Sequence, residues 1–278
     1  MMKGLPIFIL TACILCFSSS AQVLKPLEVA KAIFDPKVSP DFIGKHTTGD
    51  YNGHPNGQDF PTEINTSFLI IHQSAKKAVV AMTIADNKVK ARDKYLYFTK
   101  DSARWKMYAL ATPTLARMHE RMKNEMEAIT ADELDSLIAI YQHQEYAPYK
   151  SKEEFFFILN SLRLKLAPDD SLVAHFQQHK ATFNQLLKEV NKTSKSPETE
   201  TPTLVNTRTP AYSPLLISNV TTGGFLPAKC IDFHILNDQV GYLYTSHKKY
   251  LPELSPDKVM MLRALGGGWY LYKVQIYL

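Results

Sequence analysis

The chain has 278 residues, of which 45% are hydrophobic and 21% are charged, as expected for a globular protein of one large domain or two small ones. Its net charge of +5 is mild, and its lysines and arginines are scattered along the sequence. This composition argues against intrinsic disorder and against nucleic-acid binding.

The first 21 residues have the pattern of a bacterial signal peptide. Lys3 supplies a positive start, residues 5–17 form an uncharged apolar run, and Ser19 and Ala21 occupy the small positions of a cleavage site. We therefore predict cleavage after Ala21 and a periplasmic or secreted mature protein. No later segment is apolar enough to cross a bilayer, so we expect no transmembrane segment in the mature chain.

A lipoprotein is the alternative, because residues 10–13 resemble a lipobox that would anchor the protein to a membrane through Cys13. The apolar run continues past Cys13, however, which favours the cleaved, unanchored form. After cleavage Cys230 is the single cysteine left, so no internal disulfide can form. It lies in an apolar strand pattern, where a small buried side chain is expected.

Residues 22–111 are predicted to form an N-terminal α+β unit. An amphipathic helix is expected over residues 24–34 and a long loop over residues 46–59, which are rich in Gly, Asn and Asp. Runs rich in β-branched and aromatic residues then predict four strands. These strands are expected over residues 66–72, 78–84, 94–99 and 104–110.

Residues 112–191 change to a helical period. Two pairs with the spacing of a capping box, Thr130 with Glu133 and Ser151 with Glu154, predict helix starts, and Pro168 opens a last helix. Residues 192–213 are predicted to form a linker, because they are rich in Thr, Ser and Pro. Residues 214–278 are expected to form an antiparallel β unit that packs on the helices, with strands over residues 215–220, 230–236, 240–245, 258–265 and 269–277.

A faint internal repeat relates the two strand-rich regions at an offset of 164 residues. The matched pairs are Asp93 with Asp257, Trp105 with Trp269, and Tyr108 with Tyr272. The two tryptophans are the only ones in the chain, so we hypothesise a duplication in which both are buried where a strand packs against helices. Chance similarity between amphipathic hairpins is the alternative.

The order of a helix and an antiparallel meander, ending in Gly267, Gly268 and Trp269, resembles the close of NTF2-like or cystatin-like domains. The resemblance covers residues 65–110 and 228–278. It implies an α+β fold in which curved antiparallel sheets pack on helices, here as two such units with a central helical segment, and a cavity that binds small molecules or serves as a scaffold. The helices of residues 112–191 depart from that pattern.

Four side chains of the 46–59 loop are candidates for ligand binding: His46, Asp50, His54 and Asp59. Imidazole and carboxylate groups on a loop can bind a ligand or a cation. The EF-hand pattern fails, because Pro55 and Pro61 replace its required Gly and Glu. A plain turn-rich loop is the alternative.

Other motifs carry little chemistry. His175 and His179 lie one helical turn apart, but no Glu follows the first, so the H-E-x-x-H metalloprotease motif fails. No cofactor and no metal are predicted. The sequence favours a non-enzymatic exported module that binds a small molecule or a protein. A hydrolase-type or metal-dependent enzyme using the 46–59 loop is the alternative.

Overall fold

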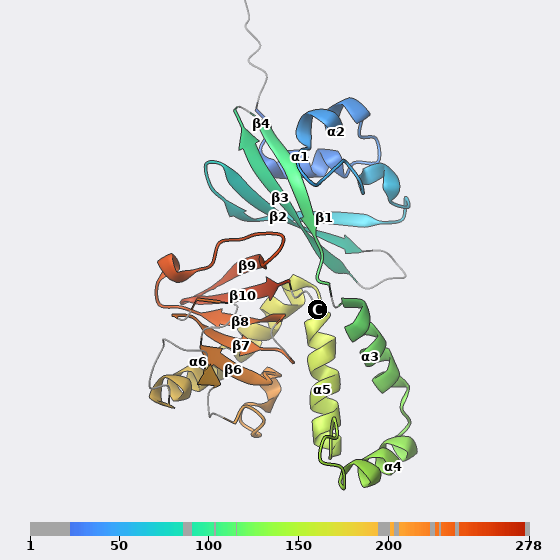
Figure 1. The fold of residues 1–278 in the computed structure, drawn as a ribbon, viewed down its shortest axis with the longest axis vertical. Coiled ribbons are helices and arrows are strands. Elements are labelled where there is room, and N and C mark those ends of the chain that lie inside the picture. Colours follow the sequence, from blue (N-terminus) through green and yellow to red (C-terminus); the bar gives the residue numbers. More distant parts are fainter. Residues whose placement is uncertain are drawn as a thin grey trace, which may run out of the picture.

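A computed structural model describes residues 23–85, 91–102, 104–114, 116–193, 201–202, 206–222, 226–227, 229–236 and 239–275 (Figure 1). The predicted signal peptide and Cys13 lie outside these ranges. The described residues form helices and two antiparallel sheets, which confirms the α+β class. Of the helices in these ranges, none combines the length and apolar character needed to cross a bilayer.

The first sheet is an antiparallel meander in the order β1-β2-β3-β4. Both of its faces are covered, because alternate residues of each strand point to opposite sides. On one side Val80 and Leu96 pack against helix α1, and on the other Val79 and Tyr97 join the central core. The elements are α1 (Pro26–Ile33), α2 (Pro40–His46), β1 (Asn65–Gln73), β2 (Lys77–Ala85), β3 (Arg92–Asp101) and β4 (Arg104–Ala111).

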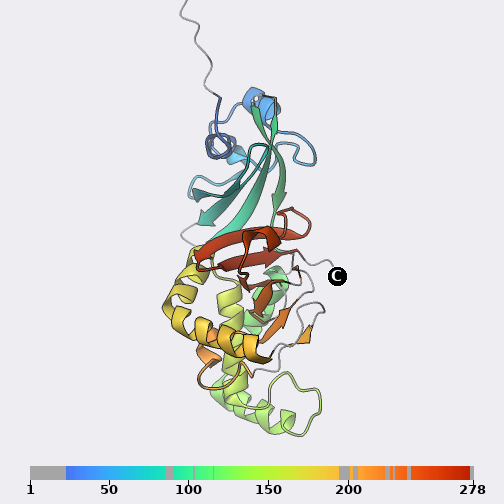
Figure 2. The ribbon, with the colours of Figure 1, turned by 90° about the vertical axis from the view of Figure 1, so that its left-hand side faces the viewer.

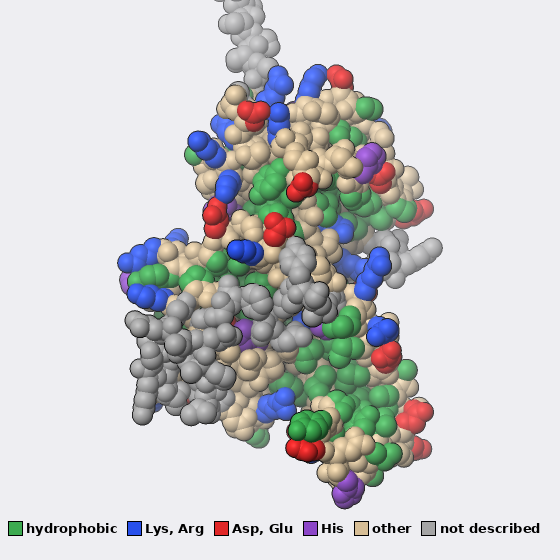
Figure 3. All heavy atoms as spheres, in the orientation of Figure 1, with side chains coloured by type: hydrophobic (Ala, Val, Ile, Leu, Met, Phe, Trp, Pro, Cys, Tyr) green, Lys and Arg blue, Asp and Glu red, His purple; other side chains and the backbone are tan. Residues whose placement is uncertain are grey.

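The helices follow in the order α3 (Ala116–Ala128), α4 (Ala131–Tyr141), α5 (Lys152–Lys165) and α6 (Asp169–Thr193). Thr130 and Glu133 form the predicted capping box of α4. At α5 only half of the predicted box is present, because the Glu154 carboxylate accepts from Lys150 N instead. Apolar side chains gather on the surface of α3, α4 and α5 (Figure 3), and Phe156 and Ile140 are among the exposed ones.

The second sheet has the strand order β5-β6-β7-β8-β10-β9. Helix α6 covers one of its faces (Figure 2). Phe176 and Phe183 of this helix pack on Trp269. The strands are β5 (Thr201–Pro202), β6 (Asn219–Thr222), β7 (Ile231–His234), β8 (Val240–Tyr244), β9 (Val259–Gly266) and β10 (Trp269–Val274). Gly266, Gly267 and Gly268 all have positive φ, which glycine adopts readily at the tight hairpin turn between β9 and β10.

One hydrophobic core joins the two sheets. It contains Val79 and Tyr97 of the first sheet, Leu172 of α6, and Tyr242 and Trp269 of the second sheet. Two tyrosine hydroxyls of β3 connect the first sheet to the rest of the molecule. Tyr97 donates to Met260 O of β9 at 2.7 Å, and Tyr95 donates to the Asp169 carboxylate of α6 at 3.0 Å. The two sheets are therefore attached by packing and by buried hydrogen bonds.

Two sequence predictions are not met. The strand expected over residues 215–220 is wrong in its first half, where the chain forms a 3-10 turn (Ser213–Leu215) and Leu216 adopts φ 55°, which lies outside the extended region of a strand. The duplication is not confirmed. Both tryptophans are buried at the start of a hairpin's second strand, but β4 is an edge strand, whereas β10 lies between β8 and β9.

Candidate functional site

The 46–59 loop covers the free edge of β4. Thr48 N donates to Met107 O at 2.9 Å, and Tyr51 N donates to Tyr108 O at 3.1 Å. An open edge strand leaves its backbone groups unpaired and is prone to pair with other chains. The first part of the loop therefore has a structural role that its turn-rich composition did not predict.

His46 takes part in this edge contact. It is the last residue of α2, its ring stacks on Phe42 with centroids 4.3 Å apart, and its Nδ1 lies 3.0 Å from the Trp105 carbonyl oxygen. A carbonyl can only accept, so Nδ1 carries the proton. This hydrogen bond holds the ring against β4. A cavity of about 440 Å³ lies beside the loop, and His46 is not among the described residues that line it.

His54 and Asp59 are brought together. His54 Nδ1 lies 2.8 Å from Asp59 Oδ2, and the same oxygen accepts from Asn56 N at 2.7 Å. The Asn56 amide first, and then His54, lower the pKa of Asp59 below its ordinary value. Both side chains are substantially exposed, at 67% and 38%, so this is an ion pair at the surface when His54 is protonated.

An open cavity of about 440 Å³ lies beside this pair. Asp50, Tyr51 and His54 line one side of it, and Asp257 and Gln275 line the other. Burial, and then the charge of Asp59, raise the pKa of the Tyr51 hydroxyl, which donates to Pro55 O at 2.6 Å. Within the described part of the chain, no three His, Cys, Asp or Glu side chains are grouped closely enough to hold a metal ion.

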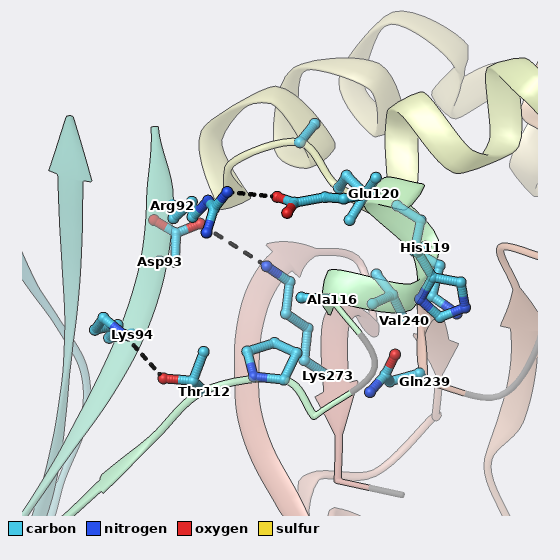
Figure 4. Close-up of a pocket in the computed structure, with 14 residues that line it drawn as sticks. Arg92, Asp93, Lys94, Thr112, Ala116, His119, Glu120, Gln239, Val240 and Lys273 are labelled. Atoms are coloured by element: carbon cyan, nitrogen blue, oxygen red, sulfur yellow. Dashed lines mark hydrogen bonds and ion pairs between the residues drawn. The ribbon is translucent and has the colours of Figure 1, made fainter. Parts of the chain in front are cut away.

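A second cavity, of about 110 Å³, lies where the first sheet, the helices and the second sheet meet (Figure 4). We call it the junction cavity. Arg92, Asp93 and Lys94 of β3 face it from one side, and His119 and Glu120 of α3 from the other. Its polar lining is completed by Thr112 just after β4, Lys165 at the end of α5, Gln239 just before β8, and Lys273 of β10.

A buried charged cluster forms the base of the junction cavity. Lys273 Nζ lies 2.7 Å from Asp169 Oδ1 and 3.8 Å from Asp93 Oδ2. Asp93 also accepts from Asp169 N at 2.6 Å and from the Thr83 hydroxyl at 2.5 Å. All of the charged members are less than 10% exposed. Buried charges persist only when they are paired and hydrogen-bonded, and this network meets that requirement.

The cluster shifts the ionisation of its members. Burial, and then the charge of Asp169, raise the pKa of Asp93 above its ordinary value. Burial and the two carboxylates raise the pKa of Tyr95 well above its ordinary value. Tyr95 therefore stays protonated and donates to Asp169, and Asp93 takes up a proton at a higher pH than an exposed aspartate does.

Positive charge is in excess at the mouth of the junction cavity. The Arg92 guanidinium pairs with Glu120 at 2.7 Å, but Lys94 Nζ donates only to the neutral Thr112 hydroxyl at 3.1 Å. Lys94 forms no ion pair with any residue that the structure describes. Burial, and then the nearby charge of Arg92, lower the pKa of Lys94.

Gln239 adds an unused donor. Its side chain is 1% exposed, and its Nε2 has no hydrogen-bond partner among the described residues. Leaving a buried amide donor unpaired costs about 1–3 kcal/mol. Gln239 lines the junction cavity, as Figure 4 shows.

The junction cavity was not predicted from the sequence, although the strand period contains a signal for it. Asp93 shares its side of β3 with Tyr95 and Tyr97, and Lys273 shares its side of β10 with Trp269 and Leu271. A charged residue in an inward-facing series needs a buried partner. That inference would have picked out Asp93 and Lys273, but the sequence does not say that they meet.

The histidine pair of α6 is structural in character. The rings of His175 and His179 lie 4.8 Å apart, and His175 Nε2 donates to Leu215 O at 3.1 Å. Burial lowers the pKa of His175, so the ring stays neutral near pH 7.

Comparison with known proteins identifies no relative. No protein-family model matches the chain, and no curated protein and no solved structure is significantly similar to it.

Proposed function

We propose that this protein is an exported, non-enzymatic binding module that holds a small oxyanion, a carboxylate or a phosphate, in the junction cavity. The observation that carries the proposal is that the same cavity is lined by Lys94, which has no ion-pair partner among the described residues, and by Gln239, whose buried amide has no hydrogen-bond partner among them. Both groups donate hydrogen bonds, and an oxyanion accepts them. The cavity has room for roughly seven to eleven heavy atoms, because a single water occupies about 10–15 Å³ of such a cavity.

Isothermal titration calorimetry tests this proposal with four probes: succinate and phosphate as anions, putrescine as a cation and glycerol as a neutral compound. We expect one anion per chain to bind, and Lys94→Met to weaken binding about tenfold or more, the size of a charged hydrogen bond. Lys45→Met, which removes an exposed lysine from α2, is the matched control and should have no effect.

The outcomes separate the parts of the proposal. Binding of putrescine instead of the anions would reject the ligand class but keep a binding function. Binding of none of the four probes would reject the junction cavity as a small-ligand site. Circular dichroism of Lys94→Met checks that the variant is folded.

A hydrolase-type activity at the 46–59 loop is the second candidate. The observation in its favour is the contact of His54 with Asp59, because a carboxylate that orients an imidazole is a common feature of general bases. Turnover of p-nitrophenyl acetate that disappears in both His54→Ala and Asp59→Asn would support it. Turnover that survives both changes would remove it.

Export is the third part of the proposal, and its support is the signal-peptide pattern. N-terminal sequencing of the protein from its native host is expected to begin at Gln22. A lipid-modified Cys13 at the start would instead establish the membrane-anchored form. A relation of the two sheets to NTF2-like or cystatin-like domains also stays a prediction.

A further inference from the structure

A groove of about 460 Å³ lies between the two sheets, separate from the junction cavity. It is lined by residues of β1 and β9, which lie side by side, and by residues 251–254. Its volume is within the range of about 300–1,000 Å³ that is typical of small-molecule sites. We call it the inter-sheet groove.

The walls of the inter-sheet groove are aromatic and apolar. Tyr97 and Tyr108, whose ring centroids lie 6.0 Å apart, come from the first sheet, and Tyr270 comes from the second. The Tyr97 hydroxyl is used within the protein, but those of Tyr108 and Tyr270 make no hydrogen bond with any residue in the described ranges. Ile71 and Leu262 add aliphatic surface. Such walls favour a flat, largely apolar ligand body.

The mouth of the groove carries charge of mainly one sign. Lys77 forms an ion pair with Glu253 across it, and both side chains are exposed. The hydrogen bond from Lys77 lowers the pKa of Glu253, so this carboxylate is ionised at neutral pH. Lys248 and His72 also line the groove, and Lys248 makes no ion pair with a residue that the structure places. An anionic group would therefore be attracted to the mouth.

We propose that the inter-sheet groove binds an amphipathic small molecule, with an aromatic body against Tyr108 and Tyr270 and an anionic group that competes with Glu253 for Lys77. The proposal does not depend on the junction cavity, which is too small for such a ligand. It rests on the apolar walls, on the positive mouth and on the ion pair between the first sheet and the segment that leads into β9.

Fluorescence titration with 8-anilinonaphthalene-1-sulfonate tests the proposal, and the neutral N-phenyl-1-naphthylamine is the uncharged comparison. We expect one sulfonate probe to bind per chain. Lys77→Met should weaken its binding about two- to fivefold, the size of an exposed ion pair, and leave the neutral probe unchanged. Glu253→Gln should strengthen sulfonate binding by a similar factor, because Lys77 loses its competitor.

Variants at three other positions separate the groove from the rest of the surface. Ala264→Trp places a large ring in the groove from an exposed position of β9, so it should abolish binding of both probes without disturbing the core. Lys76→Met, which removes the neighbouring exposed lysine, is the matched control for Lys77→Met. Phe156→Ser, in the exposed apolar surface of α5, should change nothing.

The proposal is overturned if Ala264→Trp still binds either probe, or if Phe156→Ser is the variant that loses binding. It is also overturned if Lys76→Met and Lys77→Met weaken sulfonate binding equally, because the charge effect would then be unspecific.

Discussion

Asp93 shows how one side chain can connect two distant parts of this chain. Its carboxylate accepts from Thr83 of the neighbouring strand and from the first backbone amide of α6, and it lies near Lys273 of the second sheet. Asp169 is the closer partner of Lys273. Lys273 therefore compensates the charge of Asp93 less fully than that of Asp169, and burial together with the Asp169 charge raises the pKa of Asp93.

This shift predicts a pH dependence of stability. The folded protein raises the pKa of Asp93 above the unfolded value of about 3.9, so the folded state binds more protons between the two values. The contribution of Asp93 to the free energy of unfolding is present below its pKa in the unfolded state, and it is lost as the pH rises through its pKa in the folded state. The Asp93→Asn variant has no carboxyl group to titrate at this position. The free energy of unfolding of the variant minus that of wild type should therefore increase as the pH rises above about 4.

Urea denaturation between pH 4 and pH 7 measures the difference. A pKa that differs by one between the folded and unfolded states corresponds to about 1.4 kcal/mol. Asp59→Asn is the control, because the pKa of Asp59 is lowered, so its contribution changes only below about pH 4 and should stay constant over this range. A difference between Asp93→Asn and wild type that does not change with pH would contradict the explanation of the Asp93 shift.

Helix α4 shows that local sequence can define an element's start. The Thr130 hydroxyl accepts from Glu133 N at 3.3 Å, and the Glu133 carboxylate accepts from Thr130 N at 2.8 Å. Thr130→Ala removes one side of this box and should lower the free energy of unfolding by about 0.5–2 kcal/mol. Thermal unfolding measures it, and Ser136→Ala, at an exposed position within α4, is expected to have a smaller effect.

The two tryptophans belong to different packing environments. Trp269 contacts Phe176, Phe183 and Phe233 and donates to Asn184 Oδ1 at 3.0 Å, whereas Trp105 lies in the smaller core beside α1. Both Trp→Ala variants should lose about 3–5 kcal/mol of stability.

We expect the larger loss for Trp269→Ala, because it also leaves the Asn184 side chain without this donor. Urea denaturation of both variants, with Leu69→Ala at a position 45% exposed as the control, tests this order. A loss in either tryptophan variant no larger than that of Leu69→Ala would contradict the burial argument.

At the scale of the whole molecule, the shared core predicts that the two sheets unfold together. Packing of Val79 and Tyr97 with Trp269 in one cluster, and the hydrogen bond from Tyr97 to Met260 O, make each sheet part of the other's interior. Elements that share a core usually unfold cooperatively.

The chain offers a direct test, because each sheet contains one of its two tryptophans. In Trp105→Phe the fluorescence reports the second sheet, and in Trp269→Phe it reports the first. We expect the fluorescence midpoint in urea to coincide with the circular dichroism midpoint in each variant. Separate midpoints would show that the sheets unfold independently.

Local patterns were sufficient to predict most elements. Runs rich in β-branched and aromatic residues predicted β1 to β4, the Thr130 capping box predicted α4, and Pro168 predicted the start of α6, because each depends on neighbours within a few residues. Of the four predicted site residues, His54 and Asp59 contact each other, and they too are close neighbours within one loop.

The contacts between distant segments could not be predicted in this way. The side of each strand that Asp93 and Lys273 occupy follows from alternation, but their meeting depends on how two sheets and α6 pack. The order that places β10 between β8 and β9 likewise depends on pairing between strands rather than on any local pattern. The junction cavity and the inter-sheet groove arise where separately predicted elements come together, because packing of side chains across such junctions depends on the three-dimensional arrangement and not on sequence spacing.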